Sequence, residues 1–137
     1  MSEEKFDYNK FFEQVESALT IHAHDIDRKI YEAPNIHNKI LRQLIIEKNK
    51  LNKLETKYNK MFGEKFHHYR YNHEVKIESK EVAIFYVKND PEFIKINDEF
   101  NKQSLLVETI ERWMKKATSI SFDIKNVIQY LEFMNGK

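Results

Sequence analysis

The chain has 137 residues and a net charge of +1, from 23 lysines and arginines against 22 aspartates and glutamates. This balance excludes a polybasic nucleic-acid binder but not a local basic surface, and the absence of cysteine excludes a disulfide framework. No apolar run is long enough to cross a membrane, and the first residues lack the basic and apolar regions of a signal peptide. We therefore expect a cytoplasmic protein.

The composition is typical of a helical protein. With two glycines and two prolines, the chain has far fewer turn residues than a sheet protein of this size requires. We expect one all-α domain over residues 1–137, in which a long central helix packs with shorter helices. A short helix is expected from Asn9 to about Leu19, and Pro34 punctuates the mixed segment 22–35 that follows.

The long central helix is expected from Asn38 to about Tyr69. Its apolar side chains recur as heptads, with Leu44, Leu51 and Tyr58 in one core position and Leu54 and Met61 in the other. Glu47 interrupts the second core position, and Gly63 weakens the helix by roughly 1 kcal/mol relative to alanine. A single helix of this length cannot bury its own apolar seam, so we expect it to pack on other helices or on a partner chain.

The segment 79–88 is compatible with two structures. Ser79 is a good N-cap and Glu81 falls in the first turn, which favours a helix. The apolar run 82–87 is equally compatible with a buried strand. We favour the helix because the rest of the chain offers no convincing strand to pair with.

Two more helices are expected in the last third of the chain. Asp90 and Pro91 form a strong helix start, and apolar residues spaced by three and four follow, with Gln103 as the polar exception. A separate final helix is expected to begin after Ser119 or Ser121 and to end at Asn135-Gly136. Its apolar face has little chance of full burial in so small a protomer, so we expect it to bind neighbouring copies. That face consists of Ile124, Val127, Ile128 and Leu131.

Positive charge gathers in the segment 39–70, where nine basic and three acidic side chains give +6. Lysines 50, 53, 57 and 60 share one helix face and form a ridge that attracts polyanions. The same stripe is also typical of the solvated face of a coiled-coil helix.

The end of this helix interleaves cations with aromatic rings over residues 65–71. The bases of a single strand stack on such rings while cations hold the phosphates. Phe66 and Tyr69 are alternatively core residues, whereas Lys65 is not expected to be buried. The predicted DNA-binding residues are Lys57, Lys60, Lys65, Tyr69 and Arg70, with His67 and His68 as auxiliaries.

The sequence gives no reason to expect catalysis, a metal or a cofactor. His22 and His24 are metal-type ligands, but neighbours two apart do not share a helix face, and no zinc-ligand spacing accompanies them. A glycine-rich phosphate loop and nucleophile motifs are absent. We expect a binding protein and not an enzyme.

Three stretches of the chain resemble the UvsY-type recombination mediator family of tailed phages. Residues 33–39 (APNIHNK) are similar to the family's proline-containing entry into its long helix, and residues 64–69 (EKFHHY) to its basic-then-aromatic segment. Residues 121–137 resemble its closing helix, which ends in an aromatic residue and then glycine. The chain departs from the family in lacking a glycine at 68–71 and in having Phe122 where an indole is common.

The resemblance implies a non-enzymatic mediator. Such proteins bind single-stranded DNA coated by single-strand-binding protein and help a RecA-like recombinase to nucleate its filament. They work as ring-like homo-oligomers, commonly hexamers or heptamers, held together by the C-terminal region. The alternative from the residues themselves is a helical coiled-coil scaffold that binds only protein partners; salt-sensitive binding to single strands separates the two.

Overall fold

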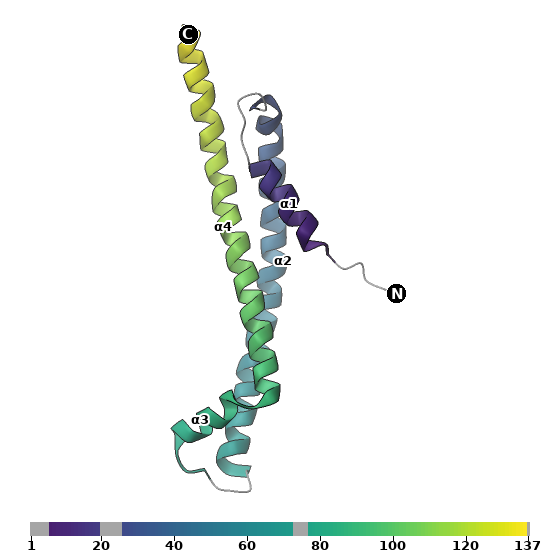
Figure 1. Ribbon diagram of the computed structural model, residues 1–137, viewed down its shortest axis with the longest axis vertical. Coiled ribbons are helices and arrows are strands. Elements are labelled where there is room, and N and C mark those ends of the chain that lie inside the picture. Colours follow the sequence, from purple (N-terminus) through teal and green to yellow (C-terminus); the bar gives the residue numbers. More distant parts are fainter. Residues whose placement is uncertain (1–5, 20–25, 73–76, 137) are drawn as a thin grey trace, which may run out of the picture. The chain divides into compact units, whose positions relative to one another are not determined.

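The described residues, 6–19, 26–72 and 77–136 of a computed structural model, form helices joined by short connections (Figure 1). In chain order these are α1 (Tyr8–Leu19), α2 (Ile26–His67), the π-helical η2 (His68–Asn72), α3 (Lys80–Lys88) and α4 (Pro91–Met134). None of the residues in these ranges forms a strand, which confirms the all-α prediction. Helices α2 and α4 have 42 and 44 residues, so the structure contains two long helices and not the single long helix that was expected.

The chain divides into two compact units, Met1–Leu44 with Thr109–Lys137 and Ile45–Glu108, called units 1 and 2 below. In unit 1, α1 buries one face against the middle of α4. The Phe12 and Trp113 rings meet edge to face at 4.6 Å, and Phe11 lies 6.2 Å from the same indole. The prediction of a single domain stays a prediction.

The core of unit 2 joins the second half of α2 to the first half of α4. The Tyr58 ring lies 5.1 Å from Phe93 and 5.3 Å from Phe100, between ring centroids. The two polar exceptions found in the sequence, Glu47 and Gln103, face each other here. The Gln103 amide donates to the Glu47 backbone oxygen at 3.0 Å and to its carboxylate at 2.5 Å. The interruption of the heptads is therefore a polar pair within the helix interface.

The start of α2 corrects the prediction that the long helix begins at Asn38. Helix α2 begins at Ile26, and Pro34 lies inside it instead of punctuating the chain before it. Proline removes one backbone hydrogen bond, but Ile36 and Ile40 in the turns after it are buried in the same helical register. Their burial favours continuing the helix through the proline. Helix α2 also continues through Gly63.

Helix α3 resolves the choice between helix and strand for residues 82–87. The Ser79 hydroxyl accepts a hydrogen bond from the Val82 N–H at 3.4 Å, as an N-cap does. Ala83 and Val87 form the fully buried side of the helix. The prediction of a helix is confirmed, and so is the predicted helix start at Asp90-Pro91.

The expected separate final helix is wrong, because α4 runs from Pro91 to Met134 without interruption. The hydroxyls of Thr118 and Ser119 donate to the carbonyl oxygens of Met114 and Lys115 at 3.0 and 3.1 Å. Bonded back to the preceding turn, they do not cap a new helix. The predicted stop is confirmed, since Gly136 has a φ of 74° and its N–H donates to the Phe133 oxygen.

Candidate nucleic-acid interface

The lysine ridge predicted from the sequence lies on α2 in unit 2. Lys53, Lys57 and Lys60 are exposed, whereas Lys50 lies 3.4 Å from the buried Glu47 carboxylate. Lys57 and Lys60 are three residues apart, so their amines project from neighbouring positions of one helix face. These two predicted DNA-binding residues are placed where a phosphate backbone has access to them.

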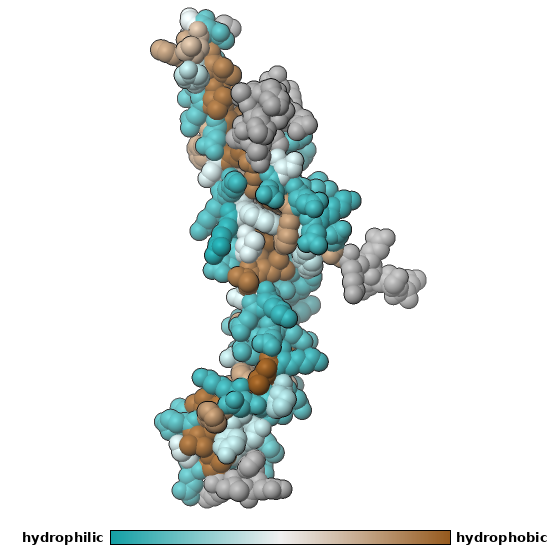
Figure 2. Space-filling view, in the orientation of Figure 1, coloured by the Kyte–Doolittle hydropathy of each residue, from teal (hydrophilic) through white to brown (hydrophobic). Residues whose placement is uncertain are grey.

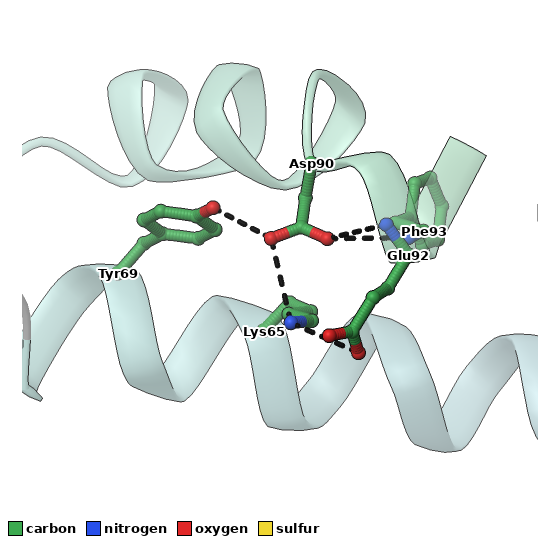
Figure 3. A network of polar contacts seen from close by, with 5 residues as sticks. All are labelled: Lys65, Tyr69, Asp90, Glu92 and Phe93. Atoms are coloured by element: carbon green, nitrogen blue, oxygen red, sulfur yellow. Dashed lines mark hydrogen bonds and ion pairs between the residues drawn. The ribbon is translucent and has the colours of Figure 1, made fainter. Parts of the chain in front are cut away.

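The next predicted residues along the chain converge on one carboxylate, that of Asp90 at the start of α4 (Figure 3). The Tyr69 hydroxyl donates to Asp90 Oδ2 at 2.6 Å, and the Lys65 amine lies 3.4 Å from the same oxygen. The other oxygen, Oδ1, accepts from the backbone N–H groups of Glu92 at 2.9 Å and Phe93 at 3.3 Å. Asp90 thus caps α4 and binds α2 and η2 at the same time.

The environment of this cluster shifts the pKa values of three groups. Burial alone would raise the Asp90 pKa, but hydrogen bonds from Tyr69 and from backbone N–H groups outweigh it and lower the pKa. The hydrogen bond to Asp90, with burial, raises the pKa of Tyr69. Burial alone would lower the Lys65 pKa, but its hydrogen bond to Glu92 and the charges of Asp90 and Glu92 outweigh it and raise the pKa. The cluster is therefore held as a carboxylate, a neutral phenol and an ammonium.

Lys65 is not buried, as expected, but its amine is already paired. Its side chain is only 20% exposed and lies between two carboxylates, 3.4 Å from Asp90 and 3.3 Å from Glu92. The Tyr69 ring is half-buried and stacks on Tyr86 at 5.6 Å. Lys65 and Tyr69 therefore fix the end of α2 to the α3–α4 junction, which sequence spacing alone did not reveal.

The remaining predicted residues lie on or next to η2. The Arg70 guanidinium lies 5.7 Å from the Phe66 ring centroid and 5.6 Å from that of Tyr71. His67 and His68 are exposed. Cations and rings are thus brought together at the end of α2, as the sequence pattern indicated.

The four residues predicted for oligomerisation differ in exposure. Ile124 is 6% exposed and belongs to the core of unit 1, while Val127 and Ile128 are half-buried. Leu131 is exposed, as are Tyr130, Phe133 and Met134 beside it and Phe122 further back along the helix. Exposed apolar side chains of the C-terminal region therefore gather in the last turns of α4.

A metal or membrane site does not emerge from the described residues. No group of three His, Asp or Glu side chains in residues 6–19, 26–72 and 77–136 is arranged to hold a metal ion. His22 and His24, considered as ligands above, lie outside these ranges. Within the same ranges, no helix combines the length and apolarity needed to span a membrane.

Comparison with known proteins identifies the family. The family model described as "Recombination, repair and ssDNA binding protein UvsY" matches residues 14–137. The chain belongs to the UvsY family. No curated protein matches it. The UvsY match covers all of α2, η2, α3 and α4, so it includes every residue of the candidate interface.

Solved structures share the UvsY fold. Crystal structures of the bacteriophage T4 recombination mediator protein UvsY superpose with TM-scores of 0.81 (lattice type II) and 0.80 (lattice type IV). The alignments cover 96% and 94% of this chain and 99% of the T4 chain in both cases. At 12% sequence identity the likeness establishes a shared fold and does not extend to individual side chains.

Proposed function

We propose that this UvsY-family protein is a recombination mediator of the host-cell cytoplasm that binds single-stranded DNA and has no catalytic activity. In this role it helps to load a RecA-like recombinase onto strands coated by single-strand-binding protein. The observation that carries the proposal is the family match over residues 14–137, whose description names recombination, repair and ssDNA binding. The exposed lysines on α2 support it, because they offer a surface for a phosphate backbone.

Within this proposal the DNA-binding residues fall into two groups. Lys57 and Lys60 are the main phosphate contacts, with Arg70, His67 and His68 beside them at the end of α2. Lys65 and Tyr69 contribute chiefly by holding η2 in place, since their polar groups are bound to Asp90. A test of the DNA surface is therefore cleaner at Lys57 and Lys60 than at Lys65.

Replacing Lys57 and Lys60 together with alanine is expected to weaken binding to single-stranded DNA of any sequence. The log–log dependence of affinity on salt should flatten by about 0.7 for each lost phosphate contact. The measurement is a titration of a fluorescent oligonucleotide at two salt concentrations. Because both side chains are exposed, the fold should be unchanged.

The matched control replaces Lys95 and Lys102, two exposed lysines of α4 in the same unit, with alanine. This control removes the same charge and should retain most of the affinity. Equal weakening by both double variants would mean that net charge, and not the α2 ridge, governs binding. A wild-type protein that binds no single strands would favour the coiled-coil scaffold instead.

We also propose that the protomers form a ring-like homo-oligomer, a hexamer or heptamer, through the last turns of α4. The exposed apolar side chains there support the proposal, since they form a surface that water disfavours. A ring repeats the modest DNA surface of one protomer several times along a strand. Such multivalency raises the overall affinity without any new contact.

Replacing Leu131 and Phe133 with aspartate is expected to reduce the oligomer to monomers or dimers. Both side chains are exposed in the protomer, at 47% and 77%, so the charges disturb an interface without entering the core. Light scattering after gel filtration measures the mass. Aspartates at Lys125 and Gln129, exposed polar positions of the same helix, provide the control and should leave the mass unchanged. An unchanged mass in the first variant would place the interface elsewhere.

A further inference from the structure

Four rings of unit 2 form a continuous series across α3 and η2, called the ring series below. It runs from Phe85 through Tyr86 and Tyr69 to His68. Neighbouring ring centroids are 6.2, 5.6 and 5.2 Å apart, and the central pair is stacked with an interplanar angle of 24°. Figure 2 shows apolar side chains gathered over α3 on the visible face. The four rings therefore follow one another in a continuous set of ring contacts, in which the central pair is stacked and the outer pairs meet edge to face.

The outer end of the ring series is open to solvent. Phe85 is 64% exposed and Tyr86 is 42% exposed, although α3 fully buries Ala83 and Val87 on its opposite side. A nine-residue helix with two buried side chains thus presents its largest rings outward. Exposed aromatic rings are costly in water, which favours a ligand that covers them.

The central pair of the ring series, Tyr69 and Tyr86, is held in position before any ligand arrives. The Tyr69 hydroxyl is bound to Asp90 at 2.6 Å, and Asp90 is itself fixed as the cap of α4. Tyr86 stacks on the ring that this bond orients. Less side-chain freedom is then lost on binding, so a stacked ligand is held more tightly.

The charges around the ring series suit a polyanion. Arg70 lies over the neighbouring Tyr71 ring, and Lys88 follows Phe85 by one helical turn on the same face of α3. The acidic side chains nearby are Asp90 and Glu92, both within 3.4 Å of the Lys65 amine, and Glu78 and Glu81. The Glu81 carboxylate, one helical turn before Phe85, accepts from the Ser79 hydroxyl at 3.0 Å. Flat rings flanked by cations favour a ligand with flat bases and a negative backbone over an apolar peptide.

We propose that the ring series is a base-stacking platform for single-stranded DNA, with Phe85 and Tyr86 as the residues on which bases stack. Lys88 and Arg70 hold the adjoining phosphates. The proposal rests on the proposed function and extends it, since it assigns base contacts to α3, a helix outside the predicted DNA surface. Because every base has a π-face, the platform does not discriminate between sequences.

The test compares two strands of equal length and charge, an oligo-dT and an abasic strand with the same backbone. Replacing Phe85 with alanine should weaken oligo-dT binding roughly tenfold, as the loss of one stacked base does. The same variant should bind the abasic strand as the wild type does, and its salt slope should be unchanged. The Lys57/Lys60 variant should instead weaken both strands and flatten the slope.

Two further variants keep the result interpretable. Phe85→Leu retains apolar area but has no π-face, so it should lose affinity for oligo-dT as alanine does. Val82→Ala removes an exposed apolar side chain of α3 that has no ring, and it should bind both strands normally. Circular dichroism and light scattering confirm that fold and oligomer size are equal in all variants.

The outcomes separate this inference from the proposed function. If wild-type protein binds oligo-dT and Phe85→Ala binds it equally well, the platform is overturned while the mediator proposal stands. Full affinity in Phe85→Leu, or equal losses on both strands, also overturns stacking. If the wild type binds neither strand, the proposed function itself fails.

Discussion

Replacing Gln103 with leucine is expected to lower the free energy of unfolding by about 3 kcal/mol. The reason is the Glu47 carboxylate, which is fully buried and accepts a hydrogen bond from the Gln103 amide at 2.5 Å. Without that donor, the Glu47 carboxylate still has its ion pair with the Lys50 amine, which is 3.4 Å away and half exposed. Equilibrium unfolding in urea measures the loss.

Replacing both Glu47 and Gln103 with leucine should recover most of this stability. Well-packed apolar residues often substitute for a buried polar pair at little cost, whereas removing one partner leaves the other polar group without its hydrogen bond. The effects of the single substitutions should therefore not add. Leucine at Asn101, an exposed position of α4, is the control and should change stability little. Simple additivity of the two core substitutions would contradict the coupling.

Replacing Asp90 with alanine is the second substitution with a large expected effect, also about 3 kcal/mol. The loss of an N-cap costs about 1 kcal/mol, and the loss of a hydrogen bond to a charged group about 2 kcal/mol more. Asp90→Asn separates these contributions, because asparagine caps a helix as well as aspartate does but does not attract Lys65. We expect Asp90→Asn to lose about 2 kcal/mol.

The same cluster contributes to the dependence of the protein's stability on pH. The Asp90 pKa is lowered on folding, so its contribution is complete above its ordinary value of 3.8 and is lost as the pH falls below it. The pKa values of Tyr69 and Lys65 are raised, so their contributions are complete below 10.0 and 10.5 and are lost as the pH rises beyond these values.

Thermal unfolding across the pH range tests this dependence. Asp90→Asn should reduce the fall in melting temperature at acid pH, and Tyr69→Phe should reduce the fall at alkaline pH. Tyr69→Phe keeps the ring against Tyr86 and removes only the hydroxyl, so it is also the control for packing. If the melting temperature falls equally at acid pH in wild type and Asp90→Asn, other carboxyl groups govern acid unfolding.

Local signals in the sequence were enough to predict several helix ends. Ser79 and Asp90 each cap a helix through a hydrogen bond to an N–H group two or three residues away. The stop at Gly136 likewise depends on one residue with a positive φ. These elements were predictable because both partners of each interaction lie within one turn of the chain.

Signals of the same kind failed where longer-range packing decided the outcome. Ser119 has the chemistry of a cap, yet its hydroxyl bonds the turn before it and α4 continues. Pro34 has the chemistry of a helix stop, yet burial of the residues after it continues α2. Neither a hydroxyl nor a proline ring carries information about which surface its helix will cover.

The candidate interface was predictable in composition but not in geometry. The spacing of Lys57 and Lys60 fixes their common helix face, and both are exposed. The ion pairing of the Lys65 amine depends on Asp90, which is far along the chain and was recognised only as a helix cap. Likewise, Phe85 was considered only as part of an apolar run, because a continuous run of apolar residues has no periodicity that separates its exposed side chains from its buried ones.

The contact between α1 and Trp113 gives the protein an internal optical reporter. Trp113 is the single tryptophan of the chain, and its indole lies against Phe11 and Phe12 of α1. If α1 leaves unit 1, water reaches the indole and its emission moves to longer wavelength. No other tryptophan contributes to this signal, so a shift in indole emission reports on the surroundings of Trp113 in unit 1 without any added label.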